Sequence, residues 1–152
     1  MRLQELIPPE HIVLGLQAVD KWEAIEGLTA RLVATGAVVD TQAQSFREAV
    51  VARERSMSTG MERGIAIPHA AVDGLERVVA ALAVVSGEGV NFDSIDARPV
   101  WLIVLLLIPR PQKLLHIRTL ADLARQLGNE DVRRTLRAAS QPHEVWQALA
   151  TR

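Results

Sequence analysis

Apolar residues recur at three- and four-residue spacings in two stretches of the N-terminal third, and each stretch predicts an amphipathic helix. The first stretch covers residues 22–33. Asp20 and Glu23 stand in capping-box spacing at its start, and Gly36 follows as a stop signal. The second stretch starts at residue 40 or 41 and ends near Arg53, just before a polar loop.

Continuous apolar runs predict buried strands elsewhere in the chain. Val78–Val85 is nearly all apolar, and Val100–Ile108 is fully apolar between two prolines, which is typical of a central strand buried on both faces. Ile12–Leu16 predicts a short strand. The alternating segment Val90–Ile95 predicts a shorter strand that is exposed on one face.

The last 40 residues carry helical signals. Residues 112–127 have a helical pattern that includes Leu115 in its apolar stripe. Asn129 caps a short helix after it, and Ser140 with Pro142 opens a final one. Together these elements predict one α/β domain over residues 1–152, with a mixed β-sheet flanked by helices.

Composition narrows the range of functions. The 152-residue chain is 49% hydrophobic, enough for a sizeable core, and its net charge of −1 provides no basic stripe for nucleic acid. Cysteine is absent, which excludes disulfides, thiolate metal ligands and cysteine catalysis. The N-terminus lacks a signal-peptide pattern, and the longest apolar run is far shorter than the roughly 20 residues that span a bilayer. We therefore expect a cytoplasmic protein without direct membrane insertion.

A polar loop from Ser56 to Gly64 leads into the apolar run Ile65–Ile67, and Pro68 then precedes His69. Proline fixes its own φ at about −65° and biases the residue before it toward an extended conformation. We therefore expect His69 to lie at the end of a strand on a stiff support, with a turn over residues 70–74 after it.

Two of the four histidines, His69 and His116, occupy positions where a ligand site can form. His116 lies in the first turns of the helix after the central strand, and ligands of α/β sheets bind at strand ends. An imidazole with a pKa of about 6.5 is largely unprotonated near neutral pH and can act as a covalent carrier. The residues alone leave two purely structural histidines as an equal alternative. His11 and His143 lie at an element boundary and in a terminal helix, and we expect no role for them.

The loop before His69 suits a phosphoryl group, whose three oxygens need donors and positive charge. Ser58, Thr59 and Gly60 offer hydroxyl and backbone donors, and Arg53 offers a forked cation. The chain has no nucleotide-type phosphate loop and no kinase-type catalytic loop. The phosphoryl donor would therefore be another phosphorylated molecule, such as a protein.

A metal site is a second hypothesis for the same residues, weaker than a phosphoryl-binding site. His69 and His116 with Glu54 or Glu62 would supply a ligand set, but zinc usually takes three or four ligands and no closely spaced histidine pair is present. We expect no metal and no cofactor.

The motif Arg53-Glu54-x-x-x-Ser58-Thr59-Gly60, followed by Gly-Ile-Ala-Ile-Pro-His69, resembles the active-site signature of a known family. This family is the fructose/mannitol-type enzyme IIA domains of the bacterial phosphotransferase system, which include the nitrogen-regulatory branch. His116 before Leu-Ala-x-Leu-Ala124 is similar to the second active-site histidine of that family and its helix. The resemblance covers residues 5–150.

The resemblance implies a phosphotransferase with a phosphohistidine intermediate. Its phosphoryl group arrives on His69 from the carrier protein HPr, or from a nitrogen-branch counterpart, and passes to an enzyme IIB domain for sugar uptake. His116 is implied to support the reaction, and Arg53 matches an arginine near the family's site. The alternative is a stand-alone regulatory protein of the nitrogen branch, whose phosphorylation state controls its binding to target proteins.

The chain departs from the family pattern in one loop. The segment Gly60-Met-Glu-Arg-Gly64 replaces a Gly-Ile-Gly-x-Gly-like sequence. We expect Glu62 to point to solvent, because an inward carboxylate would repel a phosphoryl dianion. Two further sets of residues have structural interpretations: a solvated helix face for Arg133, Arg134 and Arg137, and core positions for Trp22, Trp101 and Trp146.

Overall fold

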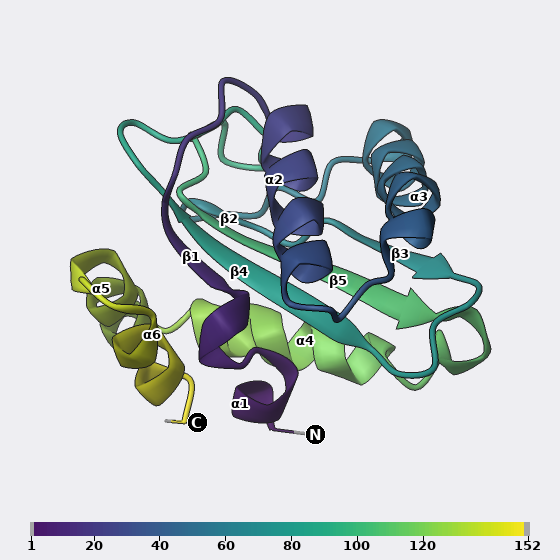
Figure 1. Cartoon of the computed structure of the whole chain (residues 1–152). Coiled ribbons are helices and arrows are strands. Elements are labelled where there is room, and N and C mark those ends of the chain that lie inside the picture. The colour runs from purple at the N-terminus through teal and green to yellow at the C-terminus, as the bar shows by residue number, and fades with distance from the viewer. Residues whose placement is uncertain (1, 151–152) are drawn as a thin grey trace.

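The computed structural model describes residues 2–150, in which five strands form one mixed β-sheet (Figure 1). The strands are β1 (Ile12–Leu16), β2 (Ile65–Ala66), β3 (His69–Val72), β4 (Val79–Val85) and β5 (Leu102–Pro109). Their order is β1–β4–β5–β2, and β3 continues along β5 beyond β2. Strand β4 runs antiparallel to β5, whereas β2 and β3 run parallel to β5 and β1 runs parallel to β4. The predicted mixed α/β fold is confirmed.

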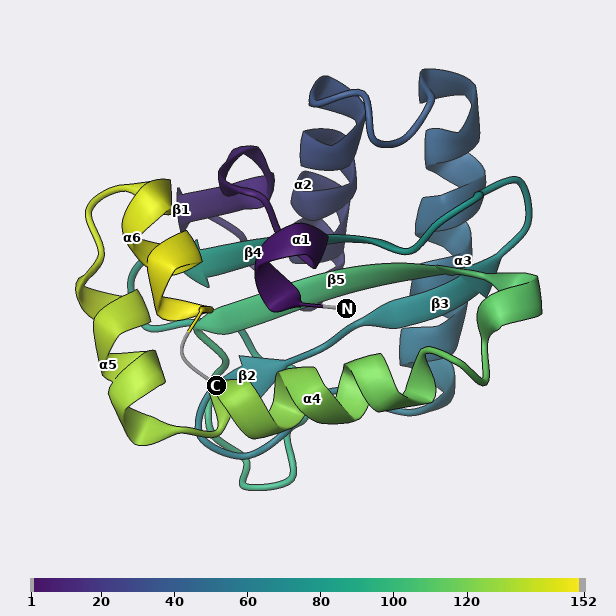
Figure 2. The ribbon, with the colours of Figure 1, turned by 90° about the horizontal axis from the view of Figure 1, so that it is seen from below.

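Helices cover both faces of this sheet. They are α1 (Leu3–Leu6), α2 (Lys21–Ala34), α3 (Ala43–Ser56), α4 (Ile117–Leu127), α5 (Glu130–Ala138) and α6 (Pro142–Ala148). Helices α2 and α3 pack on one face, and α1 and α4 lie on the other, with α5 and α6 at one end of the sheet (Figures 1 and 2). No helix within residues 2–150 combines the length and apolar character needed to cross a membrane.

Strand β5 divides the core into two halves, because successive side chains of a strand point to opposite faces. All eight of its residues are buried. Leu102, Val104, Leu106 and Ile108 belong to the cluster that contains α4 residues, and the residues between them join the cluster under α2 and α3. Burial on both faces explains why its sequence is a continuous apolar run. Of the three tryptophans, Trp101 is buried, whereas Trp22 and Trp146 pack partly buried against the two clusters.

The predicted caps form at the helix starts. The Asp20 side chain accepts a hydrogen bond from the Glu23 backbone N–H at 2.9 Å, and the Asn129 side chain accepts one from the Val132 N–H at 3.1 Å. At α6 the N-cap is Gln141, one residue after the expected Ser140. Its backbone N–H donates to Glu144 at 2.9 Å, and the N–H and hydroxyl of Ser140 donate to the same carboxylate. Each cap satisfies backbone donors that the first helical turn leaves unpaired.

The predicted strand over Val90–Ile95 is wrong. Only Val90 pairs, in an isolated antiparallel bridge with Val100, and the following residues form an irregular loop. The Asn91 side chain accepts a hydrogen bond from the Asp93 N–H at 2.8 Å, and Asp93 has a φ of 53°. This side-chain turn ends the extended conformation that the alternating sequence favours.

The position of His69 also differs from the prediction. His69 begins strand β3 instead of ending a strand, and the expected turn over residues 70–74 starts only after Val72. The reason is pairing at the sheet edge, where His69 is in register with Leu106 and Val72 with Pro109.

The predicted helix over residues 112–127 begins five residues late. Residues 110–112 form a 3₁₀ turn, residues 113–116 continue as a turn, and α4 starts at Ile117. Leu115 is therefore 69% exposed instead of lying in the apolar stripe of the helix.

Candidate functional site

The backbone leaves the sheet ladder for a short step between β2 and β3, at Ile67 and Pro68. Pro68 has no N–H to donate, but its carbonyl accepts a hydrogen bond from the Leu106 N–H at 3.0 Å. On the outer side, the loop of residues 57–64 pairs with this edge, since the Ile67 N–H donates to the Thr59 carbonyl at 3.3 Å. His69 therefore follows a backbone step that is held from both sides.

The imidazole of His69 has one bonded and one open nitrogen. Its Nδ1 lies 2.8 Å from the carbonyl oxygen of Ile67. A carbonyl can only accept, so Nδ1 carries a proton, and in the neutral ring that the lowered pKa of His69 favours, Nε2 keeps its lone pair. Within residues 2–150, no hydrogen-bond partner contacts Nε2, and the residue is half-buried. The structure therefore presents a neutral imidazole with its nucleophilic nitrogen unoccupied.

Burial lowers the pKa of His69 below its ordinary value of 6.5. The hydrogen bond to Ile67 opposes this shift, and the positive charge of Arg53 reinforces it. Glu54 raises the pKa and Lys113 lowers it, so cations from two separate segments lie near the ring. The neutral, nucleophilic form is consequently the dominant one at neutral pH.

We predict that the His69 ring titrates below pH 6.5, and that Arg53→Ala moves its pKa upward, because one repelling cation is lost. The ring has a pKa of about 6.5 in the unfolded chain and a lower pKa in the folded one. The folded state therefore loses stability as the pH falls from about 6.5 to the pKa of the folded state. The measurement is an NMR titration of the ring Cε1–H signal in the wild type and the variant. A wild-type pKa above 6.5, or an unchanged or lower pKa in the variant, would contradict this electrostatic picture.

The two candidate histidines lie on the same side of the sheet. His69 is in register with Leu106, a member of the core cluster that contains α4 residues, whereas the next residue, Ala70, belongs to the cluster under α2 and α3. The His69 side chain therefore emerges on the α4 side. His116 is the N-cap residue of α4, which runs along that face (Figure 2).

His116 is bonded within its own segment. Its Nε2 lies 3.1 Å from Oε1 of Gln112, and its Nδ1 lies 2.9 Å from the hydroxyl of Thr119. The ring is 5% exposed, and its desolvation lowers its pKa. These contacts fix the turn that carries Lys113 and connects β5 to α4.

The other candidate residues before His69 shape the loop. Arg53 is half-buried and donates from Nη1 to the carbonyl of Met57 at 2.8 Å. The Ser58 hydroxyl donates to the carbonyl of Phe92 and accepts from the Gly60 N–H. Thr59 donates its hydroxyl, at 2.6 Å, and its backbone N–H, at 3.0 Å, to the Glu54 carboxylate. Arg53 thus lies near His69, while both hydroxyls are engaged in bonds that hold the loop.

A buried ion pair anchors the same loop. Lys21 Nζ lies 3.2 Å from Oε2 of Glu54, with side chains that are 10% and 0% exposed. Lys21 also lies 3.6 Å from the exposed carboxylate of Asp93. The sequence offered no signal for Lys21, because its role depends on the packing of α2 against α3. From the sequence, Glu54 is a member of the family motif and an alternative metal ligand, and its bond to Lys21 is not foreseen.

The ligand set of the metal hypothesis is not assembled. Within residues 2–150, no group of three or more histidine, aspartate or glutamate side chains is placed to hold an ion. Glu54 is occupied by Lys21 and Thr59, and Glu62 is exposed, as expected.

The remaining two histidines have structural surroundings. His11 is buried, with Nδ1 3.0 Å from the carbonyl of Ala80 and Nε2 3.0 Å from the hydroxyl of Thr35. His143 stacks on Trp146 with their ring centroids 5.5 Å apart.

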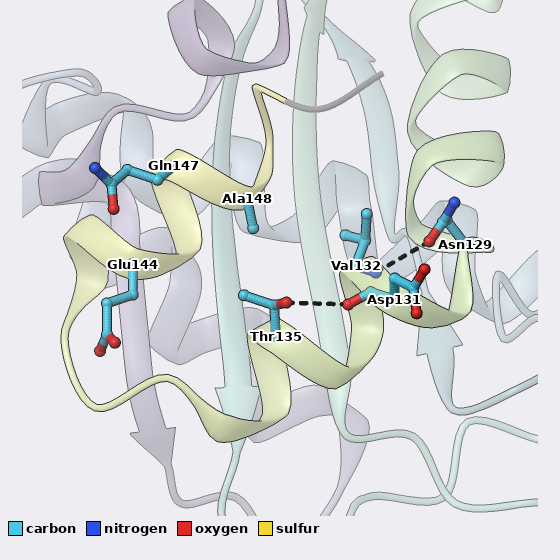
Figure 3. Close-up of a pocket in the computed structure, with 7 residues that line it drawn as sticks. All are labelled: Asn129, Asp131, Val132, Thr135, Glu144, Gln147 and Ala148. Atoms are coloured by element: carbon cyan, nitrogen blue, oxygen red, sulfur yellow. Dashed lines mark hydrogen bonds between the residues drawn. The ribbon is translucent and has the colours of Figure 1, made fainter.

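A surface hollow of about 620 Å³ lies between α5 and α6 (Figure 3). Its polar groups serve the helices themselves, since Asn129 caps α5 and the Thr135 hydroxyl donates to the carbonyl of Asp131. It lies beyond the C-terminal end of α4, whereas His116 caps the N-terminal end. This hollow is therefore separate from the histidine site.

Residues 5–151 match the model of a family described as "Phosphoenolpyruvate-dependent sugar phosphotransferase system, EIIA 2". The chain belongs to this family. Membership supports a phosphotransferase-type role and confirms the resemblance seen in the sequence.

Two curated relatives and two solved structures illustrate the range of the EIIA 2 family. A "Nitrogen regulatory protein" of Pseudomonas aeruginosa is 33% identical over 98% of this chain and 95% of the relative. A "PTS system fructose-specific EIIA component" of Haloferax volcanii is 35% identical over 97% of this chain and 94% of the relative. Both regulatory and sugar-specific proteins thus align along nearly the whole chain.

Nitrogen Regulatory Protein IIA-Ntr from Neisseria meningitidis superimposes with a TM-score of 0.86 at 30% identity, covering 97% of this chain and 98% of that one. Enzyme IIAMTL of Escherichia coli, solved in complex with phosphorylated enzyme IIBMTL, gives 0.78 at 27% identity, covering 94% and 96%. The EIIA fold of this chain is therefore shared with both branches.

Proposed function

We propose that this EIIA protein is a phosphocarrier in which Nε2 of His69 accepts a phosphoryl group from the phosphohistidine of an HPr-like protein and passes it to an enzyme IIB domain. The observation that carries this proposal is the bond between Nδ1–H and the Ile67 carbonyl, which leaves Nε2 as the bare nitrogen. The solved complex of enzyme IIAMTL with phosphorylated enzyme IIBMTL supports an enzyme IIB partner.

The proposed phosphoryl transfer to His69 needs no separate base, because the attacking nitrogen has no proton to lose. The Nε2 lone pair attacks phosphorus, a new N–P bond forms, and the N–P bond of the donor breaks with its electron pair going to the donor imidazole. A donor ring that starts protonated on its other nitrogen leaves neutral. The His69 ring then carries the positive charge, which the Ile67 carbonyl stabilises through the Nδ1–H bond.

The positive charges of Arg53 and Lys113 near His69 would stabilise the transferred phosphoryl group. Arg53 and Lys113 disfavour a proton on the ring, and the same potential favours a dianionic phosphoryl group. In this proposal Arg53 contacts the transferred group, and His116 supports it by fixing the turn that carries Lys113. Ser58 and Thr59 contribute through the loop that their hydroxyls hold.

The test is to incubate the protein with phosphorylated HPr and locate the modified nitrogen by heteronuclear NMR. We expect an acid-labile phosphoramidate on Nε2 of His69. Phosphorylation on Nδ1, or on another residue, would refute the proposed geometry.

A cluster of exposed apolar residues next to this site fits a protein donor. Leu114 and Leu115, beside Lys113, are 81% and 69% exposed, and Ile117 at the start of α4 is 56% exposed. Burial of a leucine in an interface contributes about 1.5–3 kcal/mol when it is complete. We propose that the donor protein covers this cluster during transfer.

The double substitution Leu114→Glu, Leu115→Glu should therefore lower the second-order rate of phosphoryl transfer from phosphorylated HPr about tenfold or more. The matched control is Val19→Glu with Val39→Glu, which adds the same two charges at positions that are 83% and 60% exposed and lie before α2 and between α2 and α3. Circular dichroism of both variants checks the fold. An unchanged transfer rate in the double variant would show that the donor docks elsewhere.

The regulatory alternative is favoured by the relatives named as nitrogen regulatory proteins. In this case phosphorylation of His69 controls the affinity for a target protein. A pulldown that compares wild type with His69→Asp separates the two functions. A target retained by only one of the two forms supports regulation, whereas transfer to an enzyme IIB domain without a stable complex supports transport.

A further inference from the structure

Four arginines from three separate segments line one surface hollow of about 630 Å³. Arg63 comes from the loop before β2, Arg98 from the loop before β5, and Arg133 and Arg137 from α5. Glu88 and Glu130 belong to the same lining. The sequence predicted only a solvated helix face for the α5 arginines, because it could not show that two distant loops meet them.

The charges of the four guanidinium groups are only weakly compensated in the described part of the chain, where Arg98 helps to lower the pKa of the Asp96 carboxylate. None of them forms a salt bridge there, and Glu130 instead pairs with Arg134 at 3.3 Å. A hollow lined by charge of one sign focuses the electrostatic field and attracts counter-ions. Its lining has a formal excess of two positive charges, from four arginines and two glutamates, and the neighbouring carboxylate of Asp96 reduces this excess to one.

Backbone contacts hold two of the arginine-bearing loops together. The Asp96 carboxylate accepts the backbone N–H of Arg63 at 2.9 Å and that of Arg98 at 3.1 Å. These hydrogen bonds lower the pKa of Asp96. Arg63 itself has a φ of 67°, a conformation that a non-glycine residue rarely adopts and that the Asp96 contact helps to maintain.

A single carbonyl brings a second pair of arginines side by side. Nη1 of Arg63 and Nη1 of Arg133 both donate to the carbonyl oxygen of Gly128, at 3.1 Å and 2.6 Å. Each guanidinium has further N–H groups beyond the one used here. The guanidinium groups of Arg63 and Arg133 are therefore held in place before any ligand binds, which reduces the side-chain entropy lost on binding.

The floor of the hollow limits the kind of ligand. Trp101 is only 8% exposed, and Cζ of Arg137 lies 4.6 Å above its ring. Its aromatic face is therefore already covered and offers no surface on which a nucleobase could stack. The guanidinium groups can each donate two parallel hydrogen bonds to a carboxylate or phosphate group, so the hollow suits a compact anion.

We propose that the hollow of Arg63, Arg98, Arg133 and Arg137 binds a small, non-aromatic polyanion, a phosphate ester or a polycarboxylate. The site is distinct from the phosphoryl-transfer site. It adjoins the C-terminal end of α4, and His116 caps the N-terminal end, about 16 Å away along the helix axis. The proposal does not depend on phosphorylation of His69.

The test is an NMR titration of ¹⁵N-labelled protein with inorganic pyrophosphate, and separately with citrate, at low ionic strength. The three tryptophans provide three indole N–H signals, assigned with Trp22→Phe and Trp146→Phe. We expect a saturable shift of the Trp101 signal, because Arg137 lies on that ring, and constant signals from the other two. The tighter of the two anions identifies the chemical class of the ligand.

Calorimetry of variants then tests the assignment. Arg98→Ala with Arg137→Ala should weaken pyrophosphate or citrate binding at least tenfold. The control double variant, Arg31→Ala with Arg77→Ala, loses the same charge outside the hollow and should bind within twofold of wild type. His69→Ala should also bind normally. Absence of a saturable Trp101 shift with both anions, or equal weakening in the two double variants, would overturn the proposal.

Discussion

Replacement of His69 by alanine should abolish phosphoryl acceptance from phosphorylated HPr, with a loss of at least a thousandfold in labelling rate. The reason is chemical, since alanine removes the nitrogen that we propose forms the N–P bond. His116 is not placed to substitute for it, because both of its ring nitrogens are bonded to Gln112 and Thr119. The measurement is the acid-labile label incorporated per mole of protein over time.

His116→Ala is the informative companion variant. It should still acquire the label on His69, at a rate lowered by disturbance of the Lys113 turn. Acid-labile labelling that survives in His69→Ala would refute the assignment of the acceptor. Complete loss in both variants, with both folded, would mean that His116 takes a direct part in the transfer.

The second large effect is expected on stability. Glu54→Ala removes the main partner of the buried Lys21 ammonium and the acceptor of both Thr59 donors. Breaking a buried ion pair on one side costs about 3–5 kcal/mol, and the contact of Lys21 with the exposed Asp93 carboxylate at 3.6 Å places the expected loss at the lower end of this range. For a chain of this length, this corresponds to a decrease in Tm of about 10 °C. Urea unfolding gives the free energy directly.

Two further variants interpret that result. Glu48→Ala lies on the same helix at an exposed position and should change the free energy of unfolding by less than about 0.5 kcal/mol. Lys21→Met combined with Glu54→Gln removes the buried charge and keeps an acceptor for Thr59, so it should recover part of the loss. A decrease below about 1 kcal/mol in Glu54→Ala would show that this pair does not anchor the loop.

The sequence was sufficient for those parts of the fold that depend on local pattern. The apolar run of β5, the capped start of α2 and the last two helices, α5 and α6, are where periodicity and capping residues place them. Strand β3 was missed because its pairing with β5 is a tertiary contact of residues that resemble a turn. The segment after Val90 was misassigned because the Asn91 side chain ends a pattern that favours a strand.

In the candidate site too, local sequence predicted some features, and others depend on tertiary contacts. Pro68 and the polar loop marked the position of His69, but the choice of its free nitrogen required the Ile67 carbonyl. Ser58 and Thr59 were found by type, and the partners of their hydroxyls come from Phe92 and Glu54. Lys21 could not be found, since it is 33 residues from Glu54 and the two meet only when their helices pack.

The single open nitrogen of His69 has a kinetic consequence. In the transfer that we propose, a donor protein and an acceptor protein must each bring phosphorus into line with this same atom, from the same side of the ring. The two cannot dock together, and the carrier must release the first before it engages the second. Its turnover should therefore follow a ping-pong pattern, in which an excess of either partner inhibits exchange by crowding out the other.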